Sequence, residues 1–128
     1  MIDYVTLGTN DLERAMAFYD AVLPILGHGR FSLRGGWAGY GPNGRKEPPV
    51  LWLCPPFDGA PATAGNGTMI SFTAPTREHV RKFHAAALTA GATDEGAPGL
   101  RKYAPDWYGA YVRDPDGNKL SVVCRNAE

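Results

Sequence analysis

Cysteine is scarce in this sequence, and its scarcity excludes two classes of protein. The 128 residues include only Cys54 and Cys124, which lie 70 positions apart and form no CxxC motif. A disulfide-rich fold or a structural zinc site usually needs more cysteines at shorter spacings. We therefore predict that both side chains are free thiols, buried at the ends of apolar segments.

Long apolar runs and an excess of one charge are also missing. No window holds the roughly eighteen apolar residues of a membrane span, and the first residues lack the basic and apolar regions of a signal peptide. Thirteen basic residues balance thirteen acidic ones, so no net field attracts nucleic acid or anionic lipid. The expectation is a cytoplasmic protein with neither a membrane nor a nucleic acid as its partner.

Motifs that mark several common kinds of catalysis are absent as well. The sequence has no Gly-x-Ser-x-Gly elbow, no phosphate-binding loop with Gly-Lys-Ser/Thr, and no dinucleotide fingerprint after its first strand. What remains is an ordinary globular composition, with 44% hydrophobic and 20% charged residues. Because one domain is the default at this length, residues 1–128 are predicted to form a single domain.

The first half of the chain predicts the element order β, α, β, β, β. Residues 1–8 alternate like a strand, and Asn10 with Glu13 has the spacing of a capping box at a helix start. An apolar stripe extends that helix to Gly27, although Pro24 should kink or shorten its last turn. Three short β-type runs, interrupted by a loop at 41–49, complete this half: Gly29–Arg34, Trp37–Tyr40 and Val50–Cys54.

The second half predicts the same order after a linker rich in Pro, Gly and Ala at about 55–67. Thr68–Ala74 is typical of a strand, and Thr76 is placed to cap a helix that ends at Gly91. Three further strands are predicted at Ala92–Glu95, Trp107–Arg113 and Lys119–Cys124.

An internal repeat explains this agreement between the halves. An offset of 65 residues aligns Tyr4 with Met69 and Phe18 with Phe83. The repeat divides the chain into one module at about 1–54 and a second at about 68–125.

Three motifs in this repeated arrangement are typical of a known protein family. They are Met-Ile-Asp-Tyr-Val-Thr-Leu-Gly at the start, Ala17-Phe18-Tyr19 in the first helix, and the turn Asp114-Pro115-Asp116-Gly117-Asn118 before the last strand. In this arrangement the chain resembles the vicinal oxygen chelate superfamily of glyoxalases, bleomycin-resistance proteins and extradiol dioxygenases. The resemblance implies an α+β fold of two βαβββ modules, whose curled mixed sheets surround a cavity with the helices outside. It also implies a homodimer, which is common among members of this size.

The resemblance further implies a metal site, which this sequence does not supply. Catalytic members hold a divalent ion with histidines on the first strands of the two halves and a glutamate on the last strand. The matching positions are Tyr4, Met69 and Ser121, whose phenol, thioether and hydroxyl are poor ligands for such an ion. We therefore expect no metal and no other cofactor. A divalent-metal-dependent lyase, isomerase or dioxygenase with an atypical site stays open as the alternative.

The three histidines do not replace those ligands. His79 and His84 are five residues apart on the second predicted helix, which places them on different faces, and both are expected to face solvent. His28 is expected to begin a strand.

Aromatic side chains gather in the strands and loops predicted to line the cavity, at Trp37, Tyr40, Trp52, Tyr103, Trp107, Tyr108 and Tyr111. Such a lining suits a small, partly aromatic ligand, while plain packing in the core or a dimer interface is the alternative. Arg101 and Lys102 follow the Gly- and Pro-containing segment Ala97–Leu100, which predicts a loop. This loop could close over the cavity mouth and present both cations to a carboxylate or phosphate, while a solvent-exposed pair of charges on the loop is the favoured alternative. The predicted ligand-binding residues are Tyr4, Trp37, Trp52, Met69, Arg101, Trp107, Tyr108 and Ser121. Whether a reaction is catalysed stays open, as does a protein-interaction module without any small ligand.

Overall fold

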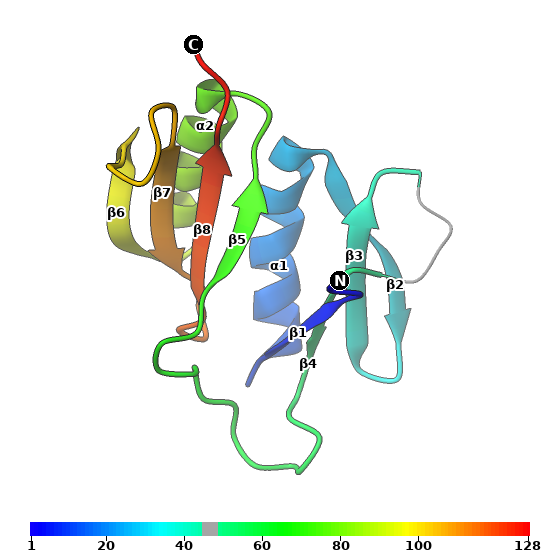
Figure 1. Cartoon of the computed structure of the whole chain (residues 1–128). Coiled ribbons are helices and arrows are strands. Elements are labelled where there is room, and N and C mark those ends of the chain that lie inside the picture. Colours follow the sequence, from blue (N-terminus) through cyan, green and yellow to red (C-terminus); the bar gives the residue numbers. More distant parts are fainter. Residues whose placement is uncertain (45–48) are drawn as a thin grey trace.

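The computed structural model describes residues 1–44 and 49–128, and two four-stranded sheets dominate it (Figure 1). The elements of the first module are β1 (Val5–Gly8), α1 (Leu12–Val22), the 3₁₀ turn η1 (Leu23–Leu26), β2 (His28–Arg34), β3 (Trp37–Pro42) and β4 (Leu51–Cys54). Those of the second are β5 (Ile70–Thr73), α2 (Arg77–Thr89), β6 (Thr93–Leu100), β7 (Tyr108–Arg113) and β8 (Lys119–Cys124). The α+β class and the repeated βαβββ modules are confirmed.

The two sheets have the same topology. Their strand orders are β1-β4-β3-β2 and β5-β8-β7-β6, so each sheet is open rather than closed into a barrel. In each, the first strand pairs in parallel with the last, through Val5↔Leu51 in one module and Ile70↔Leu120 in the other. Because the registers correspond, Trp52 of β4 is the structural equivalent of Ser121 of β8.

One hydrophobic core serves both modules. The helices pack on each other and on one face of the sheets, so the side chains that alternate toward the helices are buried. Phe18 and Phe83, aligned by the sequence offset, are each 1% exposed. Cys54 and Cys124 are buried and free, as predicted. Neither helix in the described part of the chain is long and apolar enough to cross a membrane.

The beginning of the first module differs from its prediction. The strand begins at Val5 rather than Met1, and the residues before Val5 are exposed. The N-cap of α1 is Asp11, whose carboxylate accepts a hydrogen bond from the Arg14 amide at 3.1 Å. Asn10 instead bonds the linker, donating to the Ala62 carbonyl at 3.0 Å and accepting from the Ala62 amide at 2.7 Å. The predicted Asn10 cap is therefore wrong by one residue.

The predicted loop at Ala97–Leu100 is also wrong, because β6 continues to Leu100. Its last residues pair with β7 through Gly99↔Gly109 and Leu100↔Tyr108. Two register shifts, between Asp94 and Gly96 and between Gly96 and Gly99, accommodate Pro98 in this edge strand. In the first module, Gly41 and Pro42 belong to β3, and positions 45–48 of the predicted 41–49 loop lie outside the described residues.

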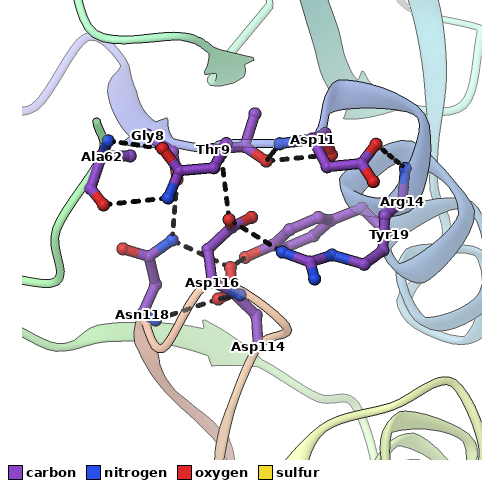
Figure 2. A network of polar contacts seen from close by, with 10 residues as sticks. Gly8, Thr9, Asp11, Arg14, Tyr19, Ala62, Asp114, Asp116 and Asn118 are labelled. Carbon is purple, nitrogen blue, oxygen red and sulfur yellow. Dashed lines mark hydrogen bonds and ion pairs between the residues drawn. The ribbon is translucent and has the colours of Figure 1, made fainter. Parts of the chain in front are cut away.

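The turn before β8 joins the two modules (Figure 2). The hydroxyl of Tyr19 in α1 donates to Asp114 Oδ2 at 2.6 Å, and Asn118 Nδ2 donates to the carbonyl of Gly8 at 3.1 Å. Tyr19 is fully buried. Its burial, together with the adjacent Asp114 carboxylate, holds the phenol's pKa well above its ordinary value, so Tyr19 remains a donor at neutral pH.

The neighbouring carboxylate extends this network. Asp116 Oδ1 accepts from the amide of Asn10 at 3.0 Å and from the guanidinium of Arg14 at 3.2 Å (Figure 2). These bonds hold the turn of the second module against the start of α1 in the first.

Candidate functional site

The sheet face turned away from the helices carries a cavity in each module. In β8, Leu120, Val122 and Cys124 belong to the hydrophobic core. The alternation of strand side chains therefore turns Lys119 and Ser121 to the opposite face. A cavity of about 400 Å³ lies on this face, and we call it the module-2 cavity. It is lined by Met69, Glu95, Tyr103, Trp107, Tyr111 and Lys119.

Aromatic rings form one wall of the module-2 cavity. The rings of Trp107 and Tyr111 are inclined by only 19°, with centroids 6.4 Å apart, and Tyr103 meets Trp107 edge to face at 5.1 Å. Two glycines make room for these rings. A Cβ on Gly109 would lie 2.5 Å from Cζ3 of Trp107, and one on Gly96 would lie 2.9 Å from Cδ2 of Tyr111.

Positive charge surrounds these rings. Lys119 Nζ lies 5.8 Å from the centroid of the Tyr111 ring, and Cζ of Arg101 lies 5.5 Å from it. Glu95 is the acidic residue of the cavity lining, and its carboxylate accepts from Arg113 Nε at 2.7 Å. Among residues 1–44 and 49–128, no carboxylate lies within ion-pair distance of Lys119 or Arg101.

Tyr111 supplies a neutral hydroxyl to the same wall. A tyrosine hydroxyl is protonated at neutral pH, and burial raises the pKa of this one further, so it can donate a hydrogen bond. The module-2 cavity thus combines flat apolar surface with a hydroxyl donor and cationic groups.

The first module has a cavity of about 350 Å³ on the corresponding face. Its lining includes Thr6, Trp37, Cys54 and Phe57, the last two from the end of β4 and the following linker. Trp37 contacts Trp52 edge to face, with centroids 5.8 Å apart. Burial raises the pKa of the Cys54 thiol, which disfavours a reactive thiolate.

The three positions matched to the family's metal ligands do not form a metal site. Tyr4 precedes β1 and is 54% exposed, while Met69 precedes β5 and lines the module-2 cavity. Ser121 is buried, and its hydroxyl donates to Ser71 Oγ at 2.6 Å. A phenol, a thioether and a hydroxyl already in use do not fit a divalent ion. The described residues contain no group of three or more His, Cys, Asp or Glu placed to hold one.

The other predicted site residues are divided between the two faces. Trp107 lines the module-2 cavity, with Arg101 beside it, while Trp37 and Trp52 lie on the first module's outer face. Tyr108 lies on the helix side of β7, with Cζ of Arg77 5.3 Å and Cζ of Arg81 5.7 Å from its ring centroid.

Sequence reasoning missed Glu95 and Lys119 as cavity residues. For Lys119, the alternation along β8 was the available signal, because it shares a face with Ser121.

The histidines have different roles from those predicted. His84 is 8% exposed, and its Nε2 lies 2.9 Å from Asp94 Oδ1, so the solvent-facing prediction is wrong for it. His79 is half-buried, with Nδ1 2.7 Å from the hydroxyl of Thr76. His28 begins β2, as predicted.

With this fold and site, the chain belongs to the Glyoxalase/Bleomycin resistance protein/Dioxygenase superfamily, whose model matches residues 1–122. It is 38% identical to a glyoxalase/bleomycin resistance protein from Albidiferax ferrireducens T118, with a TM-score of 0.86 over 97% of this chain and 98% of that one.

Two further solved structures share the fold. A glyoxalase/bleomycin resistance protein/dioxygenase family enzyme from Burkholderia phytofirmans PsJN is 24% identical, with a TM-score of 0.75 over 98% of both chains. A genomically encoded fosfomycin resistance protein from Listeria monocytogenes is 14% identical, with a TM-score of 0.70 over 97% of this chain and 92% of that one. The comparison with curated proteins gave no match.

Proposed function

We propose that this protein binds a small, partly aromatic molecule in the module-2 cavity and does so without a metal ion. The observation that carries the proposal is the cavity itself, with about 400 Å³ of space beside the rings of Trp107 and Tyr111. Small-molecule sites are typically concave and apolar, with a few polar groups that orient the ligand. Here those groups are the Tyr111 hydroxyl and the ammonium of Lys119.

The metal-free part of the proposal follows from the donor set. Tyr4, Met69 and Ser121 offer neither an imidazole nitrogen nor a carboxylate, and the Ser121 hydroxyl is bonded to Ser71. Of the three, Met69 lines the module-2 cavity, where its thioether suits packing against an organic ligand.

We also propose that the binding unit is a homodimer. Large apolar side chains exposed on the chain include Ile2, Phe31, Leu33, Phe57 and Leu100. The edges of β1 and β5 are free of strand partners in the described residues. A second copy of the chain would cover such surfaces. Light scattering coupled to gel filtration is expected to give twice the 13.8 kDa chain mass, and a monomer at micromolar concentration would refute this part.

Thermal-shift screening tests the binding proposal. The panel contains aromatic metabolites and antibiotics, since the superfamily includes antibiotic-resistance proteins. We expect at least one aromatic compound to raise the melting temperature in excess EDTA, because ligand at about 100 times its Kd stabilises the folded state by about 2.7 kcal/mol. Stabilisation that needs added zinc, nickel, iron or manganese, and that EDTA abolishes, would instead support the metal-dependent enzyme with an atypical site.

A further inference from the structure

We propose that the module-2 cavity selects aromatic anions, in which a planar ring carries a carboxylate or a similar group, and that Lys119 provides this selectivity. The inference rests on the proposed function and adds the chemical class of the ligand. Positive charge is concentrated at this cavity, although the formal net charge of the chain is +0.

The charged side chains around the module-2 cavity do not balance. Arg101, Arg113 and Lys119 bring three positive charges to the cavity and its margin, and Glu95 brings one negative charge. The Arg113–Glu95 pair, at 2.7 Å, neutralises that carboxylate. Two cations therefore remain without a carboxylate partner in the described part of the chain, and an anionic ligand would compensate them.

The two cations differ in how freely they can bind a ligand. The Arg101 guanidinium donates to the carbonyls of Ala97 at 2.7 Å and Leu100 at 3.4 Å, so the backbone of β6 holds it in place. No hydrogen bond to another described residue occupies the ammonium of Lys119, which lines the cavity directly. Lys119 is thus the cation whose donors are free for a ligand, while Arg101 contributes a fixed positive potential.

The free cation and the aromatic rings lie close together. The Lys119 ammonium lies 5.8 Å from the Tyr111 ring centroid, and the Trp107 ring centroid lies 6.4 Å from the same point. A planar ring placed against these aromatic faces would therefore carry its substituents close to Lys119. An anionic substituent would form a charge-assisted hydrogen bond there, whereas a cationic one would be repelled.

Three naphthalene probes of similar shape test this selectivity. 2-Naphthoate is the anion, 2-naphthamide is the neutral analogue, and 2-naphthylmethylammonium is the cation. Isothermal titration calorimetry of the full chain in EDTA at low salt is expected to give 2-naphthoate at least about tenfold tighter binding than the amide, since a hydrogen bond between two charged groups is stronger than one to a neutral amide. The ammonium probe is expected to bind most weakly.

Substitutions then assign the selectivity to one side chain. Lys119→Met keeps the aliphatic stem and is expected to equalise the naphthoate and naphthamide affinities, whereas Lys119→Arg retains the preference. Lys82→Met is the matched control, because Lys82 is an exposed lysine on α2 that pairs with Glu78 at 3.8 Å. It should bind all three probes like the parent chain.

The outcomes separate the two proposals. Equal or tighter binding of the amide by the parent chain would overturn the anion selectivity and leave metal-free aromatic binding standing. A carboxylate preference that survives Lys119→Met would overturn the role of Lys119. If none of the three probes binds, the inference fails, and the thermal-shift panel decides the proposed function separately.

Discussion

At the scale of single residues, glycine positions decide where aromatic rings can lie on the outer faces of the sheets. In the first module, Gly39 pairs with Trp52 across the β3–β4 ladder, and a Cβ on Gly39 would lie 2.9 Å from the Trp52 ring. At the equivalent ladder position of the second module, Tyr111 pairs with Ser121. The aromatic residue of this pair lies on the last strand, β4, in the first module and on the third strand, β7, in the second. Two sheets with the same topology therefore have cavities of different shape.

Gly109→Ala tests this complementarity in the module-2 cavity. The added methyl group would meet Cζ3 of Trp107 at 2.5 Å and the Val122 carbonyl oxygen at 3.2 Å, so the indole must move. We expect the free energy of unfolding to fall by about 1–3 kcal/mol. The near-ultraviolet circular dichroism of the tryptophans should also change.

The control is Ala104→Gly, in the exposed loop before β7, which should leave the spectrum unchanged. A second glycine-to-alanine change such as Gly36→Ala would not serve, because the φ of Gly36 is +82° and alanine would be strained there. An unaltered Gly109→Ala spectrum would contradict the close packing.

At the scale of secondary-structure elements, local patterns predicted most of the architecture and failed where distant partners decide. The apolar stripes of α1 and α2 and the Thr76 cap could be found from spacing alone. The strand at residues 97–100 could not be predicted in this way, because glycine and proline indicate a loop unless a neighbouring strand pairs with them. β7 supplies that pairing, and the register shifts of β6 absorb the irregularity.

The contact between α2 and β6 predicts a dependence of stability on pH. The hydrogen bond from His84, and then that from the Gly96 amide, lowers the pKa of Asp94 below its ordinary value of 3.8. A carboxylate with a lowered pKa in the folded state stabilises that state above its unfolded pKa. This contribution is lost as the pH falls through the folded value.

Asp94→Asn is therefore expected to lose stability relative to the parent chain at pH 5 to 6, with the difference shrinking below about pH 3.8. Urea unfolding across that range provides the measurement. Asp3→Asn, which removes an exposed carboxylate before β1, should follow the parent curve. Parallel curves for Asp94→Asn and the parent chain at every pH would show that the His84 contact has no linked titration.

At the scale of the whole molecule, the turn at Asp114–Asn118 does more than its local sequence indicates. Pro115 and Gly117 predict a hairpin turn, and Gly117 has the left-handed φ of +87° that such a turn uses. The contacts to Tyr19 and Gly8 span 95 and 110 positions of sequence, so no local pattern could predict them.

The cavity residues likewise include some that the sequence predicted and some that it could not. The aromatic side chains were visible in the strand sequences, but the Glu95–Arg113 pair, which leaves Lys119 as the available cation, depends on how β6 and β7 align.

Removal of the Tyr19 hydroxyl tests whether this turn holds the modules together. Tyr19→Phe keeps the ring, which is fully buried, but takes from the buried Asp114 carboxylate its 2.6 Å hydrogen bond. We expect the free energy of unfolding to fall by about 1–3 kcal/mol, because a charged acceptor loses a donor without access to water. Tyr103→Phe, at a 73% exposed position, is the matched control and should change stability little.

The same variant probes cooperativity between the modules. Trp37 and Trp52 report on the first module and Trp107 on the second, so fluorescence of single-tryptophan versions follows each module separately during urea unfolding. With one shared core, the parent chain is expected to give coincident transitions. In Tyr19→Phe we expect the two urea midpoints either to move apart or both to shift to lower urea concentration. The contact that is lost joins α1 of one module to the turn of the other. Midpoints equal to those of the parent chain would mean that the shared apolar core alone couples the modules.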